Sequence, residues 1–162
     1  MAGLYVIITG DGSQYFLADA TVNIDPSAED IAEIARMAAA TARRFGATPR
    51  VAMLSFSNFG DSSHPQAVKM RRATELVRES APDLLADGEM QADTAVVGEI
   101  LRDAYPFNRL GGKSANVLIF PNIDAGNVAY KLLTRLGSCE AIGPILMGMN
   151  RPIHVLQSTC RF

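Results

Sequence analysis

The chain begins with two short apolar segments that predict a β-hairpin. Leu4–Thr9 and Gln14–Ala18 are rich in apolar and aromatic side chains, and Gly10-Asp11-Gly12-Ser13 between them has the composition of a tight turn. We therefore expect two antiparallel strands at the start of the domain.

The next segment carries the clearest helical pattern. Apolar residues recur at helical spacing from Ile31 to Phe45 and would form one buried face. Asp25 fits the N-cap, Pro26 fits the first helical position, and Gly46 fits the position after the last turn. This pattern predicts an amphipathic helix between these signals.

Beyond this helix, strand-like and helix-like segments alternate. The apolar, strand-like segments are Arg50–Ser55, Leu84–Ala86 and Asn116–Phe120, with Ala141–Met147 and Ile153–Leu156 as the last strands or edge segments. The expected helices are Ala28–Phe45, Gln66–Ser80, Asp93–Ala104 and Ala125–Leu136. Such alternation predicts an α/β fold with a mostly parallel sheet, built as one domain over residues 1–162.

The helix over residues 66–80 has the pattern of one buried face. Its apolar residues are expected to point inward: Met70, Ala73, Leu76 and Val77. Its charged residues are expected to point mostly outward: Arg71, Arg72, Glu75 and Arg78.

The composition restricts the class of protein. The 162 residues are 48% hydrophobic and 20% charged, with a formal net charge of −2, which argues against a disordered or nucleic-acid-binding chain. No apolar stretch approaches the roughly 20 residues of a membrane span. Cys139 and Cys160 form no disulfide framework. We expect a cytoplasmic protein with no membrane or nucleic-acid partner.

Polar loops follow the predicted strands, at the edge where open parallel sheets bind ligands. The first contains Ser55 and Ser57, the second spans residues 87–93, and the third spans residues 121–127. The same residue types make ordinary turns and helix caps. Composition therefore leaves both interpretations open.

The last predicted helix carries a sharper signal. Lys131 and Arg135 are four residues apart and share one face, with Asn127 one turn earlier. Like charges at this spacing destabilise an isolated helix by about 0.2–0.5 kcal/mol, and a bound anion such as phosphate would reverse that effect. Alternatively, both cations stabilise the C-terminal end of the helix dipole.

Several suggestive motifs lack the context that their chemistry needs. Gly112-Lys113-Ser114 looks like the end of a P-loop, but it precedes a predicted strand instead of following one. We expect His64 in a loop or helix cap and His154 in the core.

A further group consists of four carboxylates that could bind a hard cation: Asp83, Asp87, Glu89 and Asp93. They lack the spacing of a calcium loop, so we expect solvated loop carboxylates and no metal site.

The loops described above contain motifs that resemble the phosphate acetyl/butyryltransferase family. The motifs occur in the family's order, and the match extends from about Phe16 to Gln157. They are Val51–Ser57, Asp87–Asp93, Ala115–Asn122, Gly126–Lys131 and Ala141–Ile145. Three segments resemble in particular the phosphotransacetylase-like C-terminal domain of hybrid NADP-dependent malic enzymes: Ser63–Pro65, Met90–Ala95 and Tyr105–Leu110.

The resemblance implies a three-layer α/β/α subdomain of the phosphotransacetylase and isocitrate dehydrogenase type. Family members have two subdomains, with a cleft for coenzyme A and acyl phosphate, and are typically dimers. This chain resembles the later part of such a module. The family's CoA-associated Lys and Arg fall on Lys131 and Arg135, and Asn127, Ser55 and Ser57 are the further expected residues for binding CoA or phosphate.

The sequence departs from the family at its end. The Ser-Arg pair of true phosphotransacetylases aligns with Gln157 and Ser158, the chain ends at Phe162 before the family's Asp, and residues 158–162 form an atypical tail. We therefore expect no catalytic residues in this chain. The resemblance favours an acetyl-CoA-binding regulatory and oligomerisation module of a malic enzyme that converts malate to pyruvate and CO2.

Two alternatives remain open at this point. One is a phosphate acetyltransferase, which converts acetyl-CoA and phosphate to acetyl phosphate and CoA, and the other is a ligand-free dimerisation module. The favoured interpretation implies acetyl-CoA as the ligand and a homo-oligomer built from dimers. It implies no cofactor in this chain, because NADP and a divalent metal would belong to the malic-enzyme domain.

Overall fold

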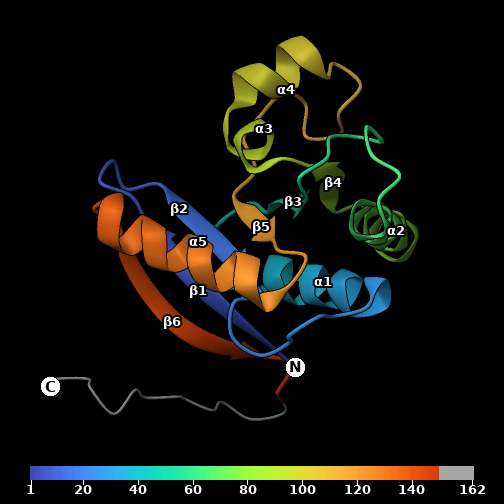
Figure 1. Ribbon diagram of the computed structural model, residues 1–162. Helices are drawn as coiled ribbons and strands as arrows, with labels where there is room; N and C mark the ends of the chain where they lie inside the picture. Colours follow the sequence, from blue (N-terminus) through green and yellow to red (C-terminus); the bar gives the residue numbers. More distant parts are fainter. Residues whose placement is uncertain (150–162) are drawn as a thin grey trace, which may run out of the picture.

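The computed structural model describes residues 1–149 and is built around one six-stranded sheet in the order β4-β3-β5-β2-β1-β6 (Figure 1). The strands are β1 (Ala2–Ile8), β2 (Gln14–Ala18), β3 (Arg50–Leu54), β4 (Leu85–Met90), β5 (Val117–Ile119) and β6 (Glu140–Met147). Neighbours among β4, β3, β5 and β2 pair in parallel, whereas β1 pairs antiparallel with both β2 and β6. The predicted mostly parallel α/β sheet is confirmed.

Helices cover both faces of this sheet, which gives the three layers. They are α1 (Ala28–Arg44), α2 (Pro65–Ser80), α3 (Ala92–Val96), α4 (Gly98–Ala104) and α5 (Ile123–Leu136). Helices α1 and α2 pack on one face, and α3, α4 and α5 contribute to the core on the other. None of the helices within residues 1–149 is long and apolar enough to cross a membrane.

The alternation of side chains along each strand supplies both cores. In β1, Leu4 and Val6 join the core under α1 and α2, whereas Tyr5 and Ile7 join the core under α3, α4 and α5. On the first face, the apolar side of α2 is buried through Met70, Ala73 and Val77, as predicted. Leu76 packs against the same core and is only partly buried.

The predicted hairpin and first helix are confirmed, and the start of that helix differs. Helix α1 begins after Ser27, whose Oγ accepts a hydrogen bond from the Asp30 N–H at 3.1 Å, while the Asp30 carboxylate accepts one from the Ser27 N–H at 3.2 Å. This reciprocal capping box satisfies two N–H groups, so Ser27 is the N-cap in place of Asp25. Gly46 follows the helix with φ of 80°, as predicted.

Strand β4 is longer than predicted and absorbs part of an expected loop. Residues 87–90, which we expected to form a loop, continue the strand that begins at Leu85. Gly88 makes this possible, because its φ is 145° and a Cβ there would lie 2.7 Å from the carbonyl oxygen of Met53 in β3. The sequence pattern did not predict this part of the strand, because its residue types are those of a turn.

Two later helices begin at other residues than the sequence pattern predicts. The helix expected over Asp93–Ala104 is interrupted at Val97, which has extended dihedrals (φ −107°, ψ 96°) and separates α3 from α4. Gln91 precedes α3 in place of the expected cap Asp93. Helix α5 is capped by Asn122 instead of Asp124, since the Asn122 Oδ1 accepts a hydrogen bond from the Ala125 N–H at 2.9 Å.

His64 caps α2, as expected for a loop or cap residue, because its Nδ1 accepts a hydrogen bond from the Gln66 N–H at 3.3 Å. The expected strand Ile153–Leu156, with His154, lies outside the described residues. So does the tail over residues 158–162.

Candidate functional site

Helix α5 lies directly on the loop that follows β2. Gly126 permits this contact, since a Cβ at that position would lie 2.5 Å from the Asp19 carbonyl oxygen and 3.0 Å from the Ala20 Cα. The amide of Asn127 is 3.4 Å from the Ala20 carbonyl oxygen, so it contacts the same loop. The first turns of α5 are therefore fixed at the end of β2, and its later turns carry the candidate cations.

Lys131 and Arg135 are both exposed on α5, one helical turn apart. Within residues 1–149, neither forms an ion pair with a carboxylate. The positive charge on this face is therefore unneutralised by the described part of the chain. Such a pair can serve an anionic ligand.

An apolar groove of about 570 Å³ lies between α5 and α3. We call it the leucine groove after six residues of the sheet and α5 that line it: Leu17, Leu54, Leu118, Leu132, Leu133 and Leu136. Leu132 is 52% exposed and Leu136 is 79% exposed. At about 100° per residue, Arg135 lies roughly 110° and Lys131 roughly 150° around the helix from the middle of the α5 residues that line the groove, so neither cation belongs to its lining.

The two predicted serines belong to a different network. The buried Ser57 donates its hydroxyl to Glu89 Oε1 at 3.0 Å and accepts a hydrogen bond from the Ser62 N–H at 3.1 Å. Ser55 Oγ accepts a hydrogen bond from the Ser57 N–H at 3.2 Å. Among residues 1–149, no hydrogen bond joins these serines to the cations of α5. The serines shape the loop after β3, and their role in ligand binding stays a prediction.

Glu89 is fully buried and is surrounded by donors. The Arg71 guanidinium binds it through two contacts, Nε to Oε2 at 3.0 Å and Nη2 to Oε1 at 2.9 Å, and the Gly60 N–H donates to Oε1 at 2.9 Å. Burial raises the pKa of this carboxyl, but the hydrogen bonds from Arg71, Gly60 and Ser57 outweigh burial and leave the pKa below its ordinary value.

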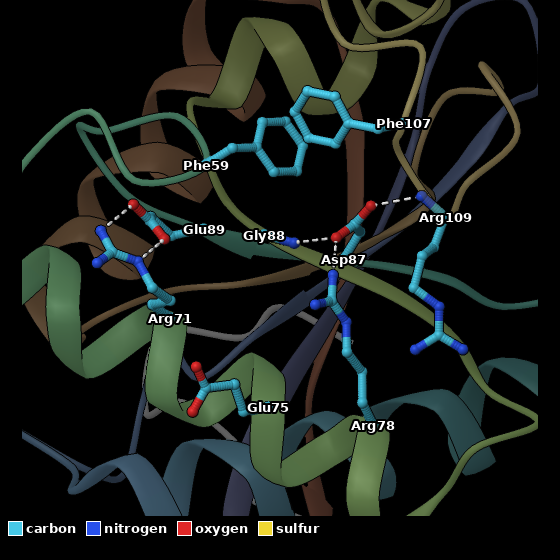
Figure 2. A pocket seen from close by; sticks show the side chains of 9 residues that line it. All are labelled: Phe59, Arg71, Glu75, Arg78, Asp87, Gly88, Glu89, Phe107 and Arg109. Atoms are coloured by element: carbon cyan, nitrogen blue, oxygen red, sulfur yellow. Dashed lines mark hydrogen bonds and ion pairs between the residues drawn. The ribbon is translucent and has the colours of Figure 1, made fainter.

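Asp87 forms a second buried network beside the first. Its carboxylate pairs with the Arg78 guanidinium and accepts hydrogen bonds from the backbone N–H groups of Gly88, at 2.9 Å, and Arg109. Together the two networks line a pocket of about 350 Å³ between α2, β4 and the segment after α4 (Figure 2). We call it the arginine pocket, after Arg71, Arg78 and Arg109.

The arginine pocket corrects two expectations. Arg71 and Arg78 were expected to face mostly outward, and Asp87 and Glu89 were expected to be solvated loop carboxylates. The arginines instead turn to β4 and neutralise both buried carboxylates. The spacing of seven residues between Arg71 and Arg78 places both on one side of α2. On β4 the register shifts at Glu89, so strand alternation gives no matching signal for Asp87 and Glu89. Within residues 1–149, no group of three or more His, Cys, Asp or Glu residues is placed to hold a metal ion.

This chain is similar to phosphate acyltransferases and to part of malic enzymes. The family model described as phosphate acetyl/butaryl transferase matches residues 1–162. An NADP-dependent malic enzyme of Escherichia coli is 54% identical over 143 residues, which cover 87% of this chain and 19% of that protein. A phosphate acetyltransferase of Bacillus subtilis is 42% identical over 159 residues, which cover 98% of this chain and 49% of that protein.

Solved structures give the same relationship. The EutD phosphotransacetylase from Staphylococcus aureus matches with a TM-score of 0.91 and 39% identity, over 98% of this chain and 49% of that one. A phosphotransacetylase from Streptococcus pyogenes matches with the same TM-score and 42% identity, over 96% of this chain and 47% of that one. The chain thus spans about half the length of the phosphate acetyltransferases and about a fifth of the malic enzymes it matches.

Proposed function

This chain belongs to the phosphate acetyl/butaryl transferase family, and from that membership we propose that it is an acetyl-CoA-binding regulatory module of an NADP-dependent malic enzyme. The observation that carries the proposal is the pair of exposed cations on α5, Lys131 and Arg135, which have no carboxylate partner within residues 1–149. The 54% identity to a malic enzyme favours that class of parent protein.

The chemistry of α5 suits a ligand of the acetyl-CoA type. Coenzyme A presents phosphates at one end and an acyl thioester on a long arm at the other. Lys131 and Arg135 would bind phosphate oxygens, and each such charge-assisted contact contributes about 1.5–3 kcal/mol when well desolvated. The leucine groove, on another side of the same helix, offers apolar surface for the less polar part of the arm. The ligand's negative charge also relieves the repulsion between the two cations.

A regulatory role, as opposed to acetyl transfer, is supported by the residues that the resemblance places at the family's catalytic positions. Transfer of an acetyl group to phosphate needs donors that stabilise a developing oxyanion, and losing one such donor typically costs about 10²–10³ in rate. The resemblance to the family implies that its Ser-Arg pair corresponds to Gln157 and Ser158, which lie outside the described residues.

A second candidate function is acetyl transfer itself, as in a phosphate acetyltransferase. The match to the Bacillus subtilis enzyme covers 98% of this chain, against 87% for the Escherichia coli malic enzyme. Under the first proposal, NADP and a divalent metal would be held by a malic-enzyme domain outside this chain. Homo-oligomerisation and a cytoplasmic location stay predictions.

The experiment that separates these functions combines a thermal-shift titration with an activity assay. We expect acetyl-CoA to raise the melting temperature of the purified chain progressively, because a ligand that binds only the folded state stabilises it by about 2.7 kcal/mol at 100 times its Kd. We expect no acetyl phosphate when phosphate is added. Robust formation of acetyl phosphate would establish the second function, and a melting temperature indifferent to acetyl-CoA would favour a ligand-free dimerisation module.

A further inference from the structure

The arginine pocket carries more hydrogen-bond donors than its own carboxylates can satisfy. We propose that it binds a phosphorylated small molecule with a flat ring, of the nucleoside monophosphate class, as a site separate from the cations of α5. Its volume of about 350 Å³ lies in the range of small-ligand pockets, which is about 300–1,000 Å³.

The buried acceptors of the pocket are already saturated. Asp87 accepts from Arg78 and from two backbone N–H groups, and Glu89 accepts from Arg71, Ser57 and the Gly60 N–H. The third lining carboxylate, on Glu75, forms an ion pair with an arginine outside the pocket. A cationic ligand would therefore find few free acceptors.

The donors are not saturated. Arg78 uses Nη2 for Asp87, and its Nε is buried without a hydrogen-bond partner. Arg109 forms no ion pair within residues 1–149, and its guanidinium has a single long contact of 3.4 Å, to the Pro82 carbonyl oxygen. A guanidinium without an ion pair at one end of a pocket is complementary to a phosphate group, which accepts several hydrogen bonds at once.

Aromatic rings form the opposite end of the pocket. Figure 2 shows Phe59 and Phe107 on one side of Asp87 and Gly88, with the guanidinium groups of Arg78 and Arg109 on the other. The two rings meet edge to face with centroids 5.2 Å apart, and Phe107 is 67% exposed. An exposed ring held by a neighbouring ring is a surface on which a flat base can stack. Rings and guanidinium groups together therefore favour a ring that carries a phosphate over inorganic phosphate alone.

Adenosine monophosphate is the probe that tests this site, with adenosine and inorganic phosphate as its two halves. Isothermal titration calorimetry on the chain should show that the monophosphate binds more tightly than either half. The Arg109→Gln substitution removes the free guanidinium from an exposed position, so we expect at least ten-fold weaker binding and an unchanged melting temperature. Arg102→Gln is the matched control, because Arg102 is an exposed arginine of α4 that pairs with Asp103, and it should bind like the wild type.

The double substitution Lys131→Gln and Arg135→Gln distinguishes this site from the proposed acetyl-CoA site. We expect the double variant to lose affinity for acetyl-CoA and to keep its affinity for adenosine monophosphate. Loss of nucleotide binding in the double variant, or unchanged binding in Arg109→Gln, would overturn the proposal. So would equal affinities for phosphate and the monophosphate, or the absence of wild-type binding at millimolar nucleotide.

Discussion

At the scale of single residues, the buried carboxylate of Glu89 connects three segments of the chain. It accepts hydrogen bonds from Ser57 and Gly60 in the loop after β3, and from Arg71 in α2, while its own backbone lies in β4. Each donor satisfies part of a charge that would otherwise be unpaired in the interior. The geometry of the loop over residues 55–62 therefore depends on this one carboxylate.

Glu89→Gln should destabilise the fold. The substitution leaves the Arg71 guanidinium without its counter-charge, and breaking a buried pair costs about 3–5 kcal/mol. The Arg71 side chain is 35% exposed, so water compensates part of this loss. We therefore expect urea unfolding to show a free energy of unfolding that is lower by about 2–3 kcal/mol. Glu75→Gln, which breaks an exposed pair with Arg72, is the control and should cost less than about 1 kcal/mol. Equal losses for both variants would contradict the central role of Glu89.

The same carboxylate should make stability depend on pH. The pKa of Glu89 is lower in the folded chain than its ordinary value of 4.5, so its contribution is fully present above that value and is lost as the pH falls toward the folded pKa. We expect the wild-type free energy of unfolding to fall below about pH 4.5, and the fall to be shallower in Glu89→Gln, as measured by urea unfolding from pH 6 to pH 3. Parallel curves for the two proteins would contradict this assignment.

The sequence pattern predicted the cations of α5 and did not predict the arginine pocket. Lys131 and Arg135 were recognisable because their spacing alone places like charges together on a helix. The partners Arg71 and Glu89 are 18 residues apart and lie on different elements, so their contact depends on how α2 packs against β4. Helical periodicity assigns charged residues to the outer face of a helix. It does not show when such a residue instead forms an ion pair with a buried carboxylate on another element.

At the scale of elements, the position of α5 depends on Gly126. An alanine at this position would favour the helix intrinsically by about 1 kcal/mol, but its Cβ would lie 2.5 Å from the Asp19 carbonyl oxygen. We expect Gly126→Ala to destabilise the chain by about 1–3 kcal/mol, because overpacking forces the helix away from β2. Gly10→Ala, in the hairpin turn with no atom within 4 Å of the added Cβ, is the control in the same urea-unfolding experiment. A Gly126→Ala variant as stable as the wild type would show that α5 adjusts freely.

Periodicity predicted the elements whose burial follows a regular pattern. The hairpin and the two long helices α1 and α2 were found within a few residues. Strand β4 was cut short because Asp87, Gly88 and Glu89 have the composition of a turn, and their charges are neutralised only by arginines of α2. The apolar periodicity does not mark the break between α3 and α4 at Val97, so the sequence pattern does not predict it.

At the scale of the whole molecule, the two proposed ligand sites lie on different parts of the fold. The cations of α5 and the leucine groove belong to the face that also carries α3, whereas the arginine pocket lies at the β4 edge between α2 and the segment after α4. Apolar side chains remain exposed on α5 and β6, such as Leu136 at 79% and Ile142 at 47%. Exposed apolar side chains of this kind are consistent with the homo-oligomer that the resemblance implies, which stays a prediction.

Isothermal titration calorimetry with acetyl-CoA, on wild-type protein and the Arg135→Ala variant, tests the proposed function most directly. Because one decade in affinity corresponds to about 1.4 kcal/mol, loss of one desolvated phosphate contact should raise the Kd about ten-fold or more. Arg43→Ala is the matched control, since Arg43 is an exposed arginine in the last turn of α1, as Arg135 is in α5. We predict weakened binding for Arg135→Ala alone, with unfolding free energies of all three proteins within about 0.5 kcal/mol. An unchanged affinity for acetyl-CoA in Arg135→Ala, or a variant that no longer folds, would contradict it.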